Sequence, residues 1–217
     1  INGALVGAGG FFGPILPNLV MPITRIYMRK MVGHLVLDAE SESLNKTLDK
    51  AAESGEQLNL NLLGEAVLGE AEAKSRAERT LKLIQNPRVT YVSVKASSMV
   101  AQLNQWDIDG SVERLKERLR PLYEEAARRN PQVFINMDME EYHDLHLTIR
   151  LFKELLSEPE FLTLDAGIVL QAYLPDTFDA LKDIADFAKE RVAKGGGKVK
   201  VRIVKGANLS MENVQSE

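Results

Sequence analysis

Five polar side chains stand at or just beyond the ends of otherwise apolar stretches: Lys95, Asp138, Gln171, Arg202 and Lys205. If the stretches are parallel strands, these side chains meet at one edge of a sheet. Charges buried there are costly unless they hold a ligand or one another. Three cations beside one or two acids suit an anionic ligand, such as a phosphate or carboxylate bearer. For each residue taken singly, structural pairing inside the fold is the alternative.

Other chemistries have weaker support. Ser97 and Ser98 follow Lys95 without a suitably placed histidine, so we interpret them as turn or cap residues. His143 and His146 share a helix face but lack a carboxylate cluster, which predicts helix-surface residues and no metal site. If the chemistry is redox, the absence of cysteine indicates an organic cofactor.

Composition bounds the class of protein. The chain has 217 residues, 45% of them hydrophobic, which suits one domain or part of one. A formal charge of −4 disfavours a nucleic-acid partner. The lack of cysteine is typical of a cytoplasmic protein. The sequence begins with Ile1 and stops at Glu217 inside a helix-like pattern, so we treat it as a fragment.

The N-terminal segment is uncharged through residue 23. Its length allows a membrane segment, but Pro14, Pro17 and Pro22 would interrupt a spanning helix, which favours a packing or interfacial arm. Residues 24–36 form a basic amphipathic segment, and residues 39–54 have a helical pattern that Gly55 ends.

The remainder alternates strand and helix. Strands are predicted over residues 57–62, 89–96, 132–138, 167–173 and from 198, with helices over 66–85, 112–129, 140–156 and 178–193. Ser111 is the expected N-cap of the second of these helices, and Pro121 should kink or divide it. Steps of roughly 30 to 40 residues between strands suit parallel βα units.

Two α/β architectures fit this order: an open doubly wound sheet, or an eight-stranded TIM-type barrel cut after about its fifth strand. The turn after the first strand, residues 63–65, lacks the glycine pattern of a dinucleotide-binding fold. We therefore favour the truncated barrel, with residues 1–55 as a leader and helical arm and residues 56–217 as the partial barrel.

Five motifs carry a family resemblance. NLLGEA at 61–66, SVKASS at 93–98, NMDMEE at 136–141, GIVLQAYLPD at 167–176 and RIVKGA at 202–207 resemble, in order and spacing, the proline dehydrogenase family. That family includes the proline dehydrogenase domain of bifunctional proline utilization A proteins. The resemblance covers residues 39–217. It implies a distorted TIM-type barrel that uses FAD to oxidise L-proline to 1-pyrroline-5-carboxylate, with hydride passing from proline C5 to flavin N5 and electrons to a membrane quinone.

The resemblance also implies roles for individual residues. Lys95 would pair with the substrate carboxylate, Asp138 and Met139 would lie near the flavin, and Arg202 would stand close to flavin N5, favouring the reduced, anionic ring. Further cofactor contacts would come from Val169, Gln171, Val204, Lys205, Gly206 and Ala207. Glu65 would gate the pocket.

The chain departs from the family pattern at two positions. Asn208 occupies the substrate-side place of a common tyrosine, and Asn61 replaces an aspartate. Residues that grip the proline carboxylate and the adenine half of FAD lie beyond Glu217 in the family, so we expect the isolated fragment to be inactive. An inactive binding or regulatory module, and an unrelated barrel enzyme that binds phosphate at residues 205–207, are the competing hypotheses. A following aldehyde dehydrogenase domain and peripheral contact with the inner face of the membrane stay open.

Overall fold

The computed structural model describes residues 17–32, 36, 42–62, 67, 69–139, 141–206 and 208–216. The chain divides into two compact units, residues 1–47 and 48–217. The domain boundary predicted after residue 55 stays a prediction. Each unit is described by itself.

The N-terminal part contains α2 (Pro17–Val32) and α3 (Glu42–Glu53). Pro17 opens α2, where a missing N–H removes no helical bond, and the helix continues through Pro22. Pro22 therefore does not interrupt this helix, contrary to our expectation, whereas Pro17 stands at its start and the earlier leader lies outside the described residues. Gly55, at φ 73°, ends α3 as predicted. Among the described helices, none has the length and apolarity needed to cross a membrane.

The second unit contains a five-stranded parallel sheet, whose order β1-β2-β3-β4-β5 follows the sequence. The strands are β1 (Leu60–Asn61), β2 (Tyr91–Lys95), β3 (Phe134–Asp138), β4 (Ala166–Gln171) and β5 (Val199–Val204). The helices are α4 (Glu70–Gln85), α5 (Ile108–Arg128), α6 (Leu145–Ser157), α7 (Thr177–Ala193) and α8 (Leu209–Ser216). Short 3₁₀ turns cover Ala96–Ser98, Tyr142–Asp144 and Pro159–Phe161. The predicted parallel βα order is confirmed.

The start of α5 differs from its prediction. Asp107 is the N-cap, because its side chain accepts a hydrogen bond from the Gly110 amide at 2.9 Å. Ser111 instead exchanges two 3.0 Å bonds with the backbone of Asn104. The helix runs through Pro121 without dividing.

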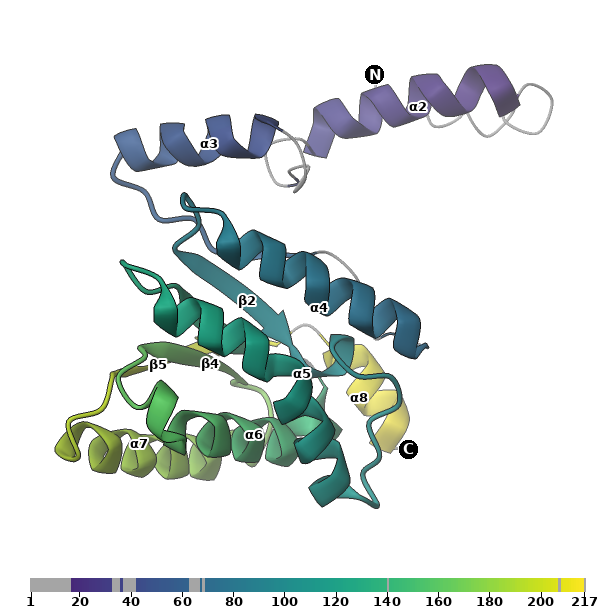
Figure 1. Cartoon of the computed structure of the whole chain (residues 1–217). Helices are drawn as coiled ribbons and strands as arrows, with labels where there is room; N and C mark the ends of the chain where they lie inside the picture. Colours follow the sequence, from purple (N-terminus) through teal and green to yellow (C-terminus); the bar gives the residue numbers. More distant parts are fainter. Residues whose placement is uncertain are drawn as a thin grey trace. The chain divides into compact units, whose positions relative to one another are not determined.

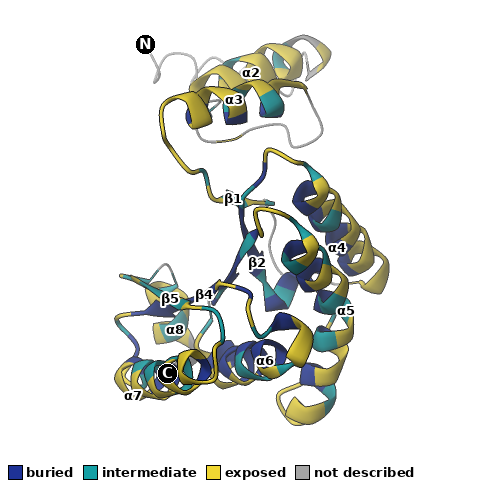
Figure 2. Ribbon diagram, turned by 60° about the vertical axis from the view of Figure 1, so that its left-hand side comes forward, coloured by how far each residue is buried: buried dark blue, intermediate teal, exposed yellow. Residues whose placement is uncertain are grey.

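Strand register separates the sheet into an apolar face and a polar face. Residues paired across the strands share a face. One face carries the rows Val92, Ile135, Ala166, Val199 and Val94, Met137, Ile168, Val201. The other carries Asn61, Ser93, Asn136, Gly167, Lys200 and, one level further along, Lys95, Asp138, Val169, Arg202. Helices α4 to α7 pack side by side along one face (Figures 1 and 2). Lys200 is exposed on the polar face, so the helices cover the apolar one.

This arrangement bears on the choice between the two α/β architectures. A doubly wound sheet reverses its strand order and has helices on both faces, whereas a βα barrel keeps sequential order with helices outside. The described sheet has sequential order, and α4 to α7 lie on one side of it. Both features favour the truncated, distorted TIM-type barrel, which stays a prediction.

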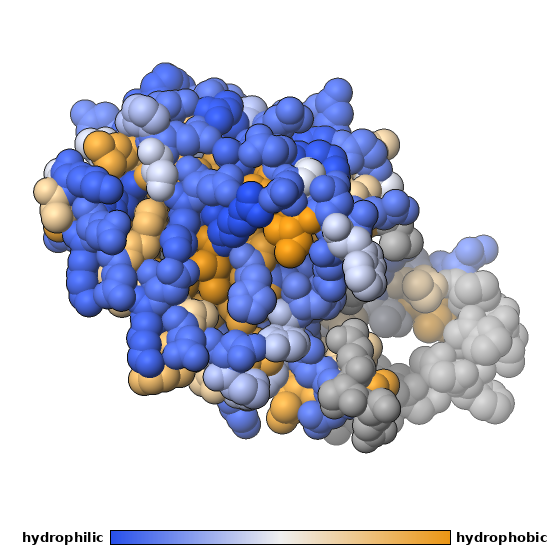
Figure 3. Space-filling view, turned by 90° about the horizontal axis from the view of Figure 1, so that it is seen from below, coloured by the Kyte–Doolittle hydropathy of each residue, from blue (hydrophilic) through white to orange (hydrophobic). Residues whose placement is uncertain are grey.

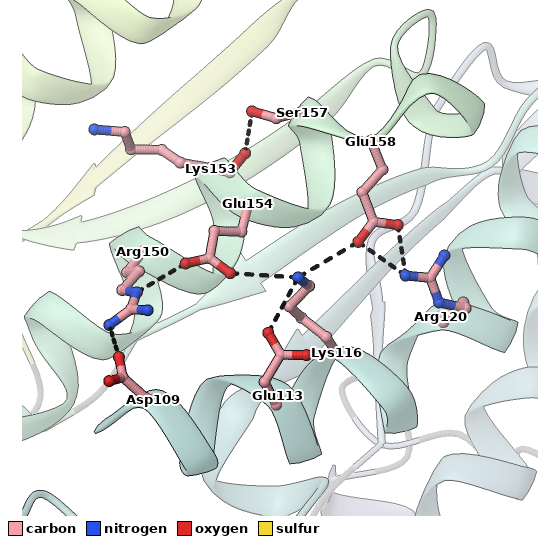
Figure 4. Close-up of polar contacts among 9 residues, drawn as sticks. All are labelled: Asp109, Glu113, Lys116, Arg120, Arg150, Lys153, Glu154, Ser157 and Glu158. Atoms are coloured by element: carbon pink, nitrogen blue, oxygen red, sulfur yellow. Dashed lines mark hydrogen bonds and ion pairs between the residues drawn. The ribbon is translucent and has the colours of Figure 1, made fainter. Parts of the chain in front are cut away.

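Ion pairs join the outer faces of neighbouring helices. Lys116 of α5 lies within 3.3 Å of Glu113 and 3.4 Å of Glu154 of α6 (Figure 4). Arg150 bonds Glu154 at 2.8 Å and Asp109 at 2.6 Å. The face of the molecule drawn in Figure 3 is largely hydrophilic, with apolar side chains interspersed.

Glu154 makes the stability of the fold depend on pH. The hydrogen bond from Arg150 lowers the pKa of Glu154 below its ordinary 4.5, burial opposes this shift, and the bond from Lys116 adds to it. A carboxyl group whose pKa is lower in the folded state stabilises above the unfolded value, and this contribution is lost as pH falls through the folded value. We expect Glu154→Gln to lower the urea midpoint at pH 7 and to reduce the loss of stability below pH 4.5. If the free energy of unfolding of Glu154→Gln fell with decreasing pH in the same way as that of the wild type, this expectation would be contradicted. Glu117→Gln, on the exposed side of α5, is the matched control.

A buried arginine fastens the end of α7 to the loops before β4 and β5. Arg191 is 3% exposed, and its guanidinium donates to the carbonyls of Phe161 at 2.7 Å, Leu164 at 2.9 Å and Gly197 at 3.1 Å. It also donates to the Leu156 carbonyl. Burial lowers the pKa of Arg191, and Asp165 opposes this shift. One side chain thus serves four backbone acceptors.

Arg191→Met should destabilise the fold strongly. The substitution leaves buried carbonyls without donors, and we expect a loss of about 3 kcal/mol in unfolding free energy. Urea unfolding followed by circular dichroism measures it. Arg128→Met is the control, because that side chain is 73% exposed and pairs within its own helix; we expect no measurable change in its unfolding free energy. Equal effects of the two substitutions would refute the role given to Arg191.

Candidate functional site

A hollow of about 380 Å³ lies where β3, β4 and β5 end. Its lining residues are Asp138, Met139, Val169, Gln171, Arg202, Val204, Lys205 and Gly206. All eight were predicted site residues, and the structure brings them together. Two larger hollows of about 580 Å³ lie in the helix layer, one lined by α4 and α5 and one by α6 and α7. We place the site at the smaller one, because strand ends converge there.

An ion pair spans the hollow. Arg202 Nη2 donates to Asp138 Oδ1 at 2.7 Å, with the Asp138 side chain 11% exposed and the Arg202 side chain 38% exposed. The carboxylate is thus largely buried in the central part of the sheet, while the guanidinium stays accessible from the hollow. Such a cation is suited to an anionic or electron-rich ligand.

Three further side chains donate to the same carboxylate, and sequence reasoning missed them as site residues. Asn136 Nδ2 lies 2.6 Å from Asp138 Oδ1, Ser93 Oγ lies 3.4 Å from that oxygen, and Asn61 Nδ2 lies 3.3 Å from Oδ2. A signal was available, because Ser93 precedes Lys95 by two residues and Asn136 precedes Asp138 by two. A period of two places such pairs on one strand face.

Gln171 is held in place at the wall of the hollow. It is 2% exposed, and its Nε2 lies 3.4 Å from the Met139 carbonyl and 3.7 Å from the Met139 sulfur. Val169, two residues earlier on β4, is also 2% exposed. Together they provide an amide and an apolar surface beside the ion pair.

The other predicted site residues fall into two groups. Lys95 ends β2 opposite Asp138 in the strand register, and Asn208 precedes α8, where its carbonyl accepts a bond from the Glu212 amide at 2.9 Å. Neither lines the hollow. Glu65 and Ala207 lie outside the described residues.

The residues considered for other chemistries lie elsewhere. Ser98 Oγ bonds the Lys95 carbonyl at 2.9 Å, as expected of a turn residue. His143 lies 3.2 Å from Glu141 and 3.4 Å from Asp144. Burial raises the pKa of Asp144, His143 opposes that shift and Glu141 adds to it. Across the described ranges, no cluster of three or more potential metal ligands occurs.

Gly206 gives the hollow its close backbone wall. Its φ is 113°, and a β-carbon there would lie 1.6 Å from Tyr173 Cε1 and 2.9 Å from Gln171 Oε1. Only glycine allows both this backbone conformation and this approach of the Tyr173 ring.

Gly206→Ala should therefore displace Tyr173 or the chain after β5. We expect a loss of about 2 kcal/mol in unfolding free energy. Gly195→Ala is the matched control, since Gly195 also has a positive φ, 78°, and nothing lies within 4 Å of the added carbon there. Thermal unfolding compares the two, and equal midpoints would show that the wall tolerates a side chain.

Comparisons with known proteins identify relatives. The proline dehydrogenase family model matches residues 44–217. The bifunctional protein PutA of Klebsiella aerogenes is 30% identical over 177 residues, which cover 75% of this chain and 13% of that protein. Proline dehydrogenase 1 of Bacillus subtilis subsp. natto is 29% identical over 166 residues, which cover 76% of this chain and 49% of that protein. The solved structure of proline utilization A from Corynebacterium freiburgense is 66% identical with a TM-score of 0.84, covering 88% of this chain and 20% of that one.

This chain thus spans between 13% and 49% of the length of the two curated relatives. The similarity to the Corynebacterium structure extends to the arrangement of the elements.

Proposed function

From the premise that the chain belongs to the proline dehydrogenase family, we propose that the protein of which it forms part oxidises L-proline to 1-pyrroline-5-carboxylate with bound FAD. The observation that supports this most is the Asp138–Arg202 ion pair, held at 2.7 Å across a hollow at the strand ends. A fixed, accessible cation favours a ligand that gains negative charge during the reaction.

The residues around the hollow fit the ring end of a flavin. A flavin ring has two apolar faces and a polar edge, and Val169 supplies an apolar surface beside the amide of Gln171. Gly206 lets the backbone approach closely, and Lys205 adds a cation at the rim. Val204, Met139 and Ala207 complete the proposed set of cofactor contacts. When bound, FAD supplies the oxidant that takes a hydride from proline C5.

The chain's own residues have separate proposed tasks. Arg202 places its positive charge beside the flavin N5 region, and Asp138 holds Arg202 in that position. Lys95, at the end of the neighbouring strand, binds the proline carboxylate. Asn208 lies on the substrate side, and Glu65 gates the entrance.

The wider setting is also part of the proposal. Relatives of this chain bear the name bifunctional protein PutA, and we infer that this chain comes from a protein of that kind, with a fused aldehyde dehydrogenase domain. Electrons would pass to a quinone at the inner face of the membrane, reached by peripheral contact from the cytoplasm. The inactivity of the isolated chain stays a prediction.

An absorbance spectrum of the complete parent protein tests the function. We expect flavin bands in protein purified without added cofactor, and bleaching of these bands by anaerobic L-proline. Bands that persist with proline would favour the silent binding module. Absence of flavin after reconstitution would overturn the proposal and favour the phosphate-binding alternative at residues 205–207.

Substitutions at two positions separate the proposed roles. Arg202→Met should slow flavin reduction at saturating proline by about 100-fold, a typical effect of removing one group that stabilises developing charge. Lys95→Met should mainly raise the proline concentration needed for half-maximal reduction. Stopped-flow absorbance measures both. Arg129→Met, which removes bonds to the carbonyls of Ile84 in the last turn of α4 and of Asn86 at its C-cap, is the control and should leave both parameters unchanged. Full-rate reduction in Arg202→Met would contradict its role.

A further inference from the structure

We propose that Asn136, Ser93 and Asn61 are positioning residues that fix the Asp138 carboxylate and, through it, aim Arg202 at the bound flavin. This inference rests on the function proposed above and extends it to residues behind the ion pair. None of the three lines the hollow.

The three residues form one level of the polar face. Strand register pairs Asn61 with Ser93 and Ser93 with Asn136. Asp138 lies one level further along the same face, two residues after Asn136. The donors therefore approach the carboxylate from the side away from the strand ends.

Each of these bonds has the carboxylate as acceptor. Asn136 Nδ2 donates to Oδ1 at 2.6 Å, Ser93 Oγ to Oδ1 at 3.4 Å, and Asn61 Nδ2 to Oδ2 at 3.3 Å. Ser93 is itself fixed, because its Oγ also accepts from Asn59 Nδ2 at 2.9 Å and from Asn136 Nδ2 at 3.3 Å. An ionised carboxylate only accepts hydrogen bonds, so this set suits a permanent negative charge beside Arg202.

The Asn136 side chain serves as a hydrogen-bond donor, and burying it costs free energy. The residue is 0% exposed, and within the described structure its Oδ1 has no hydrogen-bond partner. An unpaired buried oxygen costs free energy that a valine or leucine would avoid. Gly167 opens the space around that oxygen, since a β-carbon there would lie 2.7 Å from Oδ1. A residue that only filled this face of the sheet would be apolar, as Phe134, two residues earlier on the same face of β3, is.

The aim of Arg202 depends on Asp138. Arg202 Nη2 makes the 2.7 Å bond, and Arg202 Nε is buried without a hydrogen-bond partner in the described part of the chain. One carboxylate oxygen therefore orients the guanidinium. A shift of that oxygen would move the positive charge relative to the hollow. This movement would change the reduction potential of a flavin bound there.

The test uses the complete flavin-loaded protein, with the reduction potential measured against reference dyes. We expect Ser93→Ala and Asn136→Leu each to disfavour flavin reduction about tenfold, which is roughly 30 mV more negative for a two-electron couple. Ser93→Thr, which keeps the hydroxyl, should restore the potential. Ser157→Ala, an exposed helix position whose hydroxyl bonds only its own helix, is the matched control and should leave it unchanged.

A double substitution separates positioning from general loosening. In an Arg202→Met background, Ser93→Ala should shift the potential no further, because its effect passes through Arg202. Additive shifts, or a wild-type potential in Ser93→Ala, would overturn the inference. If thermal unfolding shows that Asn136→Leu does not fold, Asn61→Ala tests the same effect on the reduction potential at an exposed position. A parent protein without flavin would instead overturn the proposed function itself, and the inference with it.

Discussion

The Asp138 carboxylate is the group on which the arrangement of the site depends. It ends a central strand, its side chain is only 11% exposed, and a buried charge of this kind persists only with several donors around it. The donors come from β1, β2, β3 and β5. One ionised group thus explains why polar residues of four strands converge on two adjoining levels of the sheet.

The sheet face opposite to these polar residues is apolar in all of its paired rows. Val92, Ile135 and Ala166 turn toward α4 to α7, and their burial stabilises the sheet through the hydrophobic effect. Arg191 then fixes the last helix against the loops before β4 and β5. The helix-covered face supplies the stabilising burial of apolar side chains. The opposite face can therefore hold polar groups whose burial costs free energy.

Sequence reasoning predicted the strands well because their period of two survives in the residues themselves, as in VTYVSVK and KVKVRIV. It misplaced the start of α5, since Asp107 and Ser111 are both good N-cap residues and only the loop geometry selects between them. It also missed Asn136 and Ser93. Their spacing places them on the same strand faces as Lys95 and Asp138, but the register between neighbouring strands decides which side chains stand opposite one another. The connections and the packing of the whole sheet fix that register.

The position of Arg202 shows what the buried donors contribute to the site. Arg202 stands on β5 beside Val169 of β4, and its Nη2 reaches the Asp138 carboxylate on β3. That carboxylate and two of its donors stand on β2 and β3, each of which pairs with a strand on both sides. The ion pair therefore ties the orientation of the Arg202 guanidinium to side chains that are fixed within the sheet.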